Sequence, residues 1–248
     1  MRLTAKNLSK SYTGHTVVDL PEVNFGVHGL EGLIGPNGAG KSTLMGLLTR
    51  RISPTSGEIS LVSDTQETRL NPLESHDVAR IGLIKTNQRI QGFDGLTVRD
   101  NLRLAATLPA REGFGSLFDR KRDAEALDVE VESYLDRFPF ENRDGYARSG
   151  GEKKLLDILR CLIAKPKMLL MDEPTAGLPD DVTSNVMDFV QDLVRSSKMQ
   201  VVIVEHDLPM IWKYCSYVHF LSEGKMLFQG SPDDVKSNHV VAEKYMGV

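Results

Sequence analysis

The sequence predicts an α/β fold with a mostly parallel central sheet, an N-terminal antiparallel β subdomain and an inserted helical subdomain. Three observations support this prediction. Residues 2–12 and 16–27 interleave polar and apolar side chains, as half-exposed antiparallel strands do. Residues 167–173 and 200–207 instead contain continuous apolar runs, which is typical of central parallel strands covered on both faces. Residues 96–162 between them have the spacing and charge of helices.

The composition is that of an ordinary globular protein with a well-buried core. The chain has 248 residues, of which 40% are hydrophobic and 26% are charged. Its formal net charge of −4 argues against the basic face of a nucleic-acid-binding protein, so no nucleic acid is expected as a partner. Cys161 and Cys215 are too few for a disulfide framework or a metal cluster, and we expect buried thiols in a reducing cytoplasm.

The chain lacks the apolar segments of membrane proteins. Residues 1–10 contain no apolar h-region of a signal peptide. No apolar run approaches the roughly 20 residues that span a bilayer. We therefore expect any membrane role to depend on a separate membrane subunit.

The first elements of the predicted core surround a glycine-rich loop. A short apolar strand at 30–35 leads into 35-GPNGAGKST-43, and residues 42–51 then have helical apolar spacing. The loop fits the pattern G-x-x-x-x-G-K-[ST] without a mismatch, and its flanking strand and helix are the context that a phosphate loop requires. These flanks argue against a chance glycine-rich turn.

The residue types of this loop suit a nucleoside triphosphate and Mg²⁺. Glycines allow backbone N–H groups to surround the β- and γ-phosphates, Lys41 reaches their oxygens, and Ser42 offers a hydroxyl to the metal. The candidate nucleotide-binding residues are Gly35, Pro36, Asn37, Gly38, Ala39, Gly40, Lys41, Ser42 and Thr43.

Three helices are expected in the inserted segment. Thr97 and Asp100 form a capping-box-like start for a helix at 98–107. A link broken by proline and glycine leads to the charged helical pattern at 120–138, and a third helix is expected to follow Ser149 and run to about Ala164.

The last part of the chain returns to the core. Residues 217–230 have the pattern of a hairpin that turns at Glu223 and Gly224, and Ser231 starts a short terminal helix. We interpret residues 1–248 as one domain, composed of a core at 1–90 and 163–248 and a helical subdomain at 91–162.

Polar side chains follow two of the central strands. Asp172 and Glu173 come directly after residues 168–171, and His206 follows residues 201–204. Ligands of open α/β sheets bind at the carboxyl edge of the strands, so we expect these side chains to converge on one nucleotide. Asp172 would belong to the Mg²⁺ shell, Glu173 would polarise a water, and His206 would steady the γ-phosphate. Considered alone, such residues are more often solvated strand ends or ordinary histidines.

Gln88 and Tyr12 are weaker candidates. Gln88 lies at the end of the candidate strand 81–86 and would reach the metal, although alone it is unremarkable. Tyr12 would stack on adenine, but an aromatic residue on an early strand more often belongs to the core.

A second glycine-rich stretch, 147-ARSGGEKK-154, lies ahead of the third expected helix. Its serine and glycines present free backbone N–H groups at a helix N-terminus, which is a ready anion site. The chain therefore has two candidate phosphate-binding loops.

In this order, the motifs resemble those of the ATP-binding subunits of ABC transporters, over essentially the whole chain. Residues 35–43 resemble the Walker A loop, and 168-MLLMDEP-174 resembles the Walker B strand. Gln88 is similar in position to the Q-loop glutamine, His206 to the switch histidine and Tyr12 to the A-loop aromatic residue. The core of the signature motif is matched by Ser149, Gly150, Gly151 and Glu152.

The resemblance implies a P-loop NTPase core that binds ATP and Mg²⁺. Two ATPase subunits, identical or paralogous, would face head to tail, with each ATP between one Walker A loop and the partner's signature motif. Glu173, His206 and Gln88 would be catalytic. The metal would be bound by Ser42, Gln88 and Asp172.

The resemblance also implies partners and a location. Integral membrane permease subunits would bind near the Q-loop and the helical subdomain and would be driven by closure of the ATPase pair. The chain would then sit at the cytoplasmic face of the inner or plasma membrane.

Several stretches resemble the ATPases of branched-chain amino-acid and urea-type importers, which implies uptake of amino acids or a related small polar solute. These stretches are 94–102, the FGSLF insertion around residue 116, DEPTAGL, EHDLPMI and 241–247. The lipopolysaccharide-export ATPase has the same features, so export of lipid or lipopolysaccharide stays open. So does a nucleotide-gated regulatory module, although Glu173 and His206 favour hydrolysis. A translation or DNA-repair protein is disfavoured by the single cassette and short helical insertion.

Three residues depart from the family pattern. Arg148 stands where the signature usually begins with leucine, Pro179 where the D-loop usually has Asp or Asn, and Asn87 where an aromatic residue is common. Arg148 would either add a cation near the partner's ATP or pack its aliphatic stem in place of leucine, and the second reading is favoured. Pro179 would rigidify the dimer-contact turn.

Overall fold

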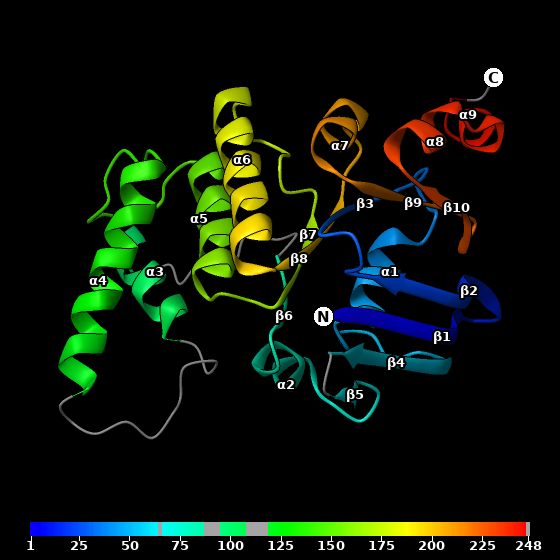
Figure 1. Ribbon diagram of the computed structural model, residues 1–248, viewed down its shortest axis with the longest axis horizontal. Coiled ribbons are helices and arrows are strands. Elements are labelled where there is room, and N and C mark those ends of the chain that lie inside the picture. Colours follow the sequence, from blue (N-terminus) through cyan, green and yellow to red (C-terminus); the bar gives the residue numbers. More distant parts are fainter. Residues whose placement is uncertain (64–65, 87–94, 108–118, 247–248) are drawn as a thin grey trace.

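The computed structural model describes residues 1–63, 66–86, 95–107 and 119–246. The chain forms a four-stranded sheet in the order β2-β1-β4-β5 and a six-stranded sheet in the order β10-β9-β3-β8-β7-β6. The strands occupy one side of the molecule, and helices α3 to α6 occupy the other (Figure 1). An α/β fold with a mostly parallel main sheet and an N-terminal antiparallel sheet is therefore confirmed.

The antiparallel sheet begins with a tight hairpin. β1 and β2 are joined by Thr13 and Gly14, which both have positive φ, as the two-residue turns that match strand twist require. Both strands mix buried and exposed residues along their length, which confirms the half-exposed pattern. The strands of this sheet are β1 (Arg2–Tyr12), β2 (His15–Phe25), β4 (Ser56–Val62) and β5 (Glu67–Arg69).

The main sheet carries the functional strand ends. Four of its strands, β3, β8, β7 and β6, are parallel to one another, β9 is parallel to β3, and β10 closes the edge as an antiparallel hairpin. All residues of β3 and β7 are buried, as the continuous apolar runs predicted. The strands are β3 (Leu30–Ile34), β6 (Leu83–Lys85), β7 (Met168–Asp172), β8 (Gln200–Val204), β9 (Tyr217–Ser222) and β10 (Lys225–Gly230).

Helices cover both faces of the main sheet. One apolar cluster joins α1 to both sheets, and a second joins the other face of the main sheet to α3 through α7. In Figure 1, α1 lies between the antiparallel strands and the main sheet. The helices are α1 (Lys41–Leu48), α2 (Ser75–Arg80), α3 (Val98–Ala106), α4 (Asp119–Arg137), α5 (Gly150–Ile163), α6 (Asp180–Ser197), α7 (Leu208–Tyr214), α8 (Pro232–Ser237) and α9 (His239–Met246).

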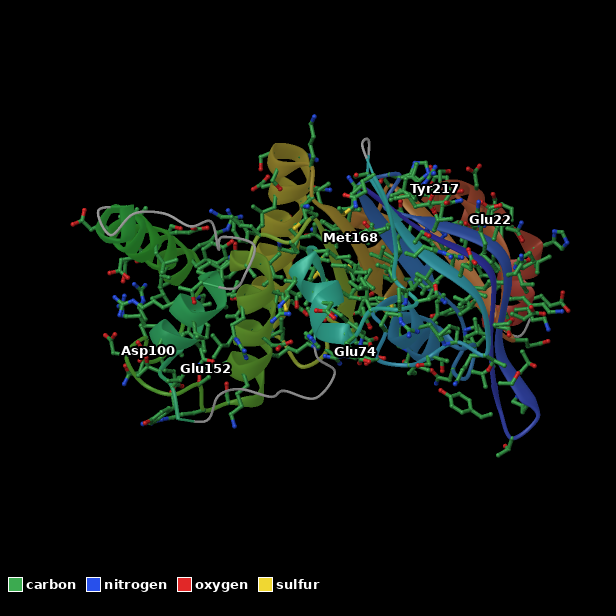
Figure 2. The ribbon with its side chains drawn as sticks, turned by 90° about the horizontal axis from the view of Figure 1, so that it is seen from below. Glu22, Glu74, Asp100, Glu152, Met168 and Tyr217 are labelled. Atoms are coloured by element: carbon green, nitrogen blue, oxygen red, sulfur yellow. The ribbon has the colours of Figure 1, made fainter. Side chains whose placement is uncertain are left out.

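Side-chain caps fix where three of these helices begin. The Thr97 hydroxyl accepts from the Asp100 backbone N–H at 3.1 Å, and Ser149 and Ser231 form full capping boxes. Asp100 and Glu152, in the first turns of α3 and α5, lie at the same end of the helical part (Figure 2). The predicted starts of α3, α5 and α8 are thus confirmed.

Short elements account for most differences from the sequence prediction. The prediction omitted β4, β5, α2 and α7, and it expected one terminal helix where the structure has α8 and α9. The division into core and helical subdomain stays a prediction. Both cysteines are buried, and burial raises the pKa of the Cys161 and Cys215 thiols, the latter to about 12. Among the described residues, no helix combines the length and apolar character needed to cross a bilayer.

A buried ion pair links β3 to β9. His219 Nε2 lies 2.9 Å from Glu31 Oε2, and both side chains are fully buried. Glu31 Oε1 accepts hydrogen bonds from the backbone N–H groups of Val27 and His28. Burial alone would raise the pKa of Glu31, but the His219 contact and the backbone N–H groups hold it below its usual value.

We predict that Glu31→Gln lowers the free energy of unfolding by about 3 kcal/mol at neutral pH, because it breaks a buried pair. The native pKa is depressed, so the ionised carboxylate stabilises the fold above its unfolded pKa of about 4.5, and this contribution is lost as the pH falls through the native pKa. Urea denaturation at a series of pH values should show that the difference in unfolding free energy between Glu31→Gln and the wild type shrinks as the pH falls below about 4.5. A loss of unfolding free energy that is the same at every pH would contradict this explanation. Glu223→Gln, at an exposed carboxylate, serves as the control.

Candidate nucleotide site

A cavity of about 260 Å³ lies at the carboxyl edge of the main sheet. Residues 37–43 of the glycine-rich loop form one wall, and Glu173 and His206 form the other. Val17 of β2 and Val204 of β8 complete the lining. The structure thus brings together side chains that lie more than 160 residues apart in the chain, as the strand-end argument predicted.

Two glycines allow the loop its path. Gly40 has a φ of +101°, and a Cβ at this position would lie 2.7 Å from the Val17 carbonyl oxygen. A Cβ on Gly35 would lie 1.9 Å from the Leu221 carbonyl oxygen, so β9 tolerates only glycine at the start of the loop. Because α1 begins at Lys41, immediately after the loop, its first free N–H groups belong to the same wall.

Lys41 is held by the loop itself. Its ammonium group donates to the carbonyl oxygens of Gly35 at 2.6 Å and Pro36 at 3.0 Å. Burial lowers the pKa of Lys41, while the carboxylates of Glu173 and Asp172 act in the opposite direction. The lysine therefore lies between the loop backbone and the acidic strand end, where a phosphate would meet it.

Asp172 ends β7 and is almost fully buried. Its Oδ2 accepts from Lys85 Nζ at 2.8 Å, and its backbone N–H donates to the Thr86 hydroxyl at 3.0 Å. Its Oδ1 is buried and has no hydrogen-bond partner among the described residues. A buried carboxylate oxygen without a partner is costly unless it serves a ligand.

Glu173 leaves the strand in a left-handed conformation. Its φ is +48°, which is uncommon outside glycine and turns the chain sharply after β7. The backbone N–H of Glu173 donates to Val204, and its half-exposed carboxylate faces the cavity. Such backbone outliers concentrate at functional sites, which supports a functional interpretation of this residue.

His206 contacts Glu173 across the cavity. The distance from His206 Nε2 to Glu173 Oε1 is 3.3 Å, so the expected convergence of the two side chains is confirmed. The neighbouring Glu205 was not identified from the sequence. Its buried carboxylate accepts from the His206 backbone N–H and from both the backbone N–H and hydroxyl of Thr175, and so joins the ends of β7 and β8.

The signature residues line a second cavity, of about 370 Å³. Ser149, Gly151 and Glu152 face Gly177 and Pro179 there, and this cavity shares no lining residue with the first. Burial would raise the pKa of Glu152. The backbone N–H groups of Arg148, Glu141 and Ser149 donate hydrogen bonds to its carboxylate and hold the pKa below its usual value. The negative charge of Glu152 thereby stabilises the N-terminus of α5.

The departing residues lie around this second cavity. Arg148 is exposed, and its backbone N–H donates to Glu152 Oε2 at 2.9 Å. Pro179 precedes α6 directly and lines the cavity. Their functional effects stay predictions.

The other sequence candidates do not line either of these two cavities or lie outside the described residues. Tyr12 ends β1 with 45% of its surface exposed, so the alternative that it belongs to the core does not hold, and its stacking on adenine stays a prediction. The Lys10 ammonium lies 4.8 Å from the centre of the Tyr12 ring, and the ring does not line the 260 Å³ cavity. Gln88, Asn87 and the FGSLF insertion lie outside the described residues.

Comparisons with known proteins agree with this geometry. Residues 22–176 match the family model described as ABC transporter. The branched-chain amino acid transport ATP-binding protein LivG of Salmonella typhimurium is 31% identical over 87% of this chain and 86% of its own. The lipopolysaccharide export ATP-binding protein LptB of Haemophilus influenzae is 32% identical over 99% of this chain and 97% of its own.

Solved structures show the same fold. An ATP-binding cassette of an ABC transporter in its ADP conformation is 25% identical over the full length of both chains, with a TM-score of 0.76. A dimeric cassette in a post-hydrolysis state, bound to ADP and phosphate, covers 93% of this chain with a TM-score of 0.77 at 21% identity. The family model, which spans more than half of the chain, and relatives above 30% identity along most of it identify this protein as an ATP-hydrolysing member of the ABC transporter family.

Proposed function

We propose that this chain is the ATPase subunit of a transporter, driving a separate integral membrane permease from the cytoplasmic face of the membrane. The observation that carries the proposal is the cavity that joins the glycine-rich loop to Glu173 and His206. A module that only bound ATP would need no such pair. The contact between a carboxylate and a histidine beside a phosphate loop therefore favours turnover.

The residues present fit a bound Mg²⁺. Asp172 offers a buried carboxylate oxygen without a partner among the described residues, and the exposed Ser42 lines the 260 Å³ cavity beside the neighbouring Glu173. Oxygen ligands of this kind suit Mg²⁺. Ser42 and Asp172 would hold the ion, with Gln88 as a further ligand. When bound, Mg²⁺ would neutralise charge on the β- and γ-phosphates.

The chain's own residues would then perform the hydrolysis. The loop N–H groups and Lys41 hold the triphosphate and oppose its negative charge. Glu173 accepts a hydrogen bond from the attacking water and aligns it with the γ-phosphate. His206, which touches Glu173 at 3.3 Å, fixes the direction of that carboxylate and contacts the γ-phosphate.

The second cavity serves the partner subunit's nucleotide in this proposal. Ser149 and the first N–H groups of the 14-residue α5 form an anion site that shares no lining residue with the first cavity. Two copies facing head to tail would complete each other's sites. Loss of the γ-phosphate would remove the contact that holds the copies together, and the pair would reopen to move the permease.

Import of an amino acid or a related small polar solute is the transport function that we favour. LivG of Salmonella typhimurium and BraF of Pseudomonas aeruginosa, both named as branched-chain amino acid transport proteins, support it. Export is the second candidate, because the similarity to LptB extends over nearly the whole chain. Reconstitution with a membrane permease that copurifies with this chain, followed by measurement of the direction of solute movement, would distinguish the two.

We expect Glu173→Gln to reduce ATP turnover by at least about 100-fold, because the amide cannot accept the proton of the attacking water. Binding of a fluorescent ATP analogue should change little, since the loop and Lys41 are intact. Phosphate release and analogue binding are the two measurements, and Glu223→Gln is the matched control at an exposed carboxylate. Equal turnover by Glu173→Gln and the wild type would rule out the proposed hydrolytic role.

We expect the Glu173→Gln protein to elute as a dimer in size-exclusion chromatography with ATP and as a monomer without it. Adding Ser149→Arg should abolish the dimer while leaving binding of the ATP analogue intact, because Ser149 serves the partner's nucleotide. Ser196→Arg, on the exposed face of α6, is the matched control. An ATP-dependent dimer that survives Ser149→Arg would contradict the head-to-tail arrangement.

A further inference from the structure

A buried lysine is bonded to the carboxylate of Asp172. Lys85 is the last residue of β6, and its Nζ lies 2.8 Å from Asp172 Oδ2. Only 8% of the Lys85 side chain and 1% of the Asp172 side chain are exposed. No motif singled out in the sequence includes Lys85, which follows the two apolar residues of β6.

The pairing of β6 with β7 explains how the two side chains meet. Lys85 is in register with Leu170, and its long side chain reaches along β7 to the residue two positions further on. The backbone N–H of the next residue, Thr86, donates a hydrogen bond to the Leu170 carbonyl oxygen. The Thr86 hydroxyl accepts a hydrogen bond from the backbone N–H of Asp172. The end of β6 thus holds both the backbone and the side chain of Asp172.

The two oxygens of Asp172 consequently differ. Oδ2 is engaged by a charge-assisted hydrogen bond, whereas Oδ1 is buried without a partner among the described residues. A carboxylate with one oxygen already occupied has only the other to offer a cation. Mg²⁺ can be bound through a single carboxylate oxygen because it keeps several of its waters, whereas Ca²⁺ often binds both oxygens of a carboxylate.

We propose that Lys85 is a positioning residue that reserves Asp172 Oδ1 for the metal and thereby makes the site selective for Mg²⁺ over Ca²⁺. This inference rests on the proposed metal-binding role of Asp172. Lys85 acts through the carboxylate and does not touch the nucleotide. Without it, Asp172 is free to rotate and to present both oxygens.

The chain offers a matched control for the charge of Lys85. Lys154 of α5 is also buried, and its Nζ lies 3.4 Å from the backbone carbonyl oxygen of Asp172. Lys154→Met removes a buried positive charge near Asp172 without freeing Oδ2. Removing either charge should alter the affinity for both divalent ions alike, so the ratio of the two affinities isolates the positioning effect.

The experiment measures binding of a fluorescent ATP analogue as Mg²⁺ or Ca²⁺ is titrated. In the wild type the half-saturating concentration should be lower for Mg²⁺. Lys85→Met should reduce the preference for Mg²⁺ about tenfold, the scale on which partners of metal ligands act. Lys154→Met should leave the ratio unchanged. An unchanged ratio in Lys85→Met, or an equal change in Lys154→Met, would overturn the proposal.

Two further variants keep the outcomes distinct. Asp172→Asn tests the metal-binding role itself: if the wild type and Asp172→Asn bind the analogue equally well at every Mg²⁺ concentration, the proposed metal role fails rather than the role of Lys85. If Lys85→Met does not fold, Lys85→Gln replaces it, because the amide is neutral and holds Oδ2 more weakly. A smaller loss of preference in the same direction is then expected, and no loss would overturn the inference.

Discussion

The parallel pairing of β3, β8 and β7 is the constraint on which the rest of the site depends. Leu33 pairs with Val204, and Val204 pairs with Asp172, so the glycine-rich loop, the acidic pair and His206 leave the sheet at one edge. Parallel strands require crossover connections, and the helices in these crossovers bury both faces of the sheet. The same burial makes these strands rigid and so fixes the positions of their ends. A phosphate, a metal and a water can therefore be held there by fixed groups rather than by solvent.

Polar groups in this core occur as bonded sets. Glu31 is bonded to His219, Asp172 to Lys85, and Glu205 to Thr175, so each of these buried carboxylates has a polar partner. Buried charges of this kind contribute little net stability compared with apolar packing, but removing one partner is costly. Their common effect is to fix the positions of the strand ends. Asp172 Oδ1 is the exception, because it has no hydrogen-bond partner in the part of the chain that the structure describes, and this points to a ligand rather than to a defect.

The sequence predicted the parts of the fold that have strong local signals. Continuous apolar runs identified β7 and β8, and capping residues identified the starts of α3, α5 and α8. Short elements such as β5, α2 and α7 were omitted because three to seven residues carry too little periodicity, and tertiary contacts determine them. The convergence of Lys41, Glu173 and His206 followed from strand order. The roles of Lys85 and Glu205 did not, because hydrogen bonding across strands depends on a register that one sequence does not reveal.

The most direct test of this account is a crystal structure of the Glu173→Gln protein with ATP and Mg²⁺. We predict two copies facing head to tail, with the triphosphate in the loop at residues 35–43. The metal should lie beside Ser42 and Asp172 Oδ1, and Ser149 of the other copy should lie against the γ-phosphate. A nucleotide bound away from this loop would contradict the assignment of the site. A nucleotide enclosed by the loop and Ser149 of one and the same chain would contradict the division of each site between two subunits.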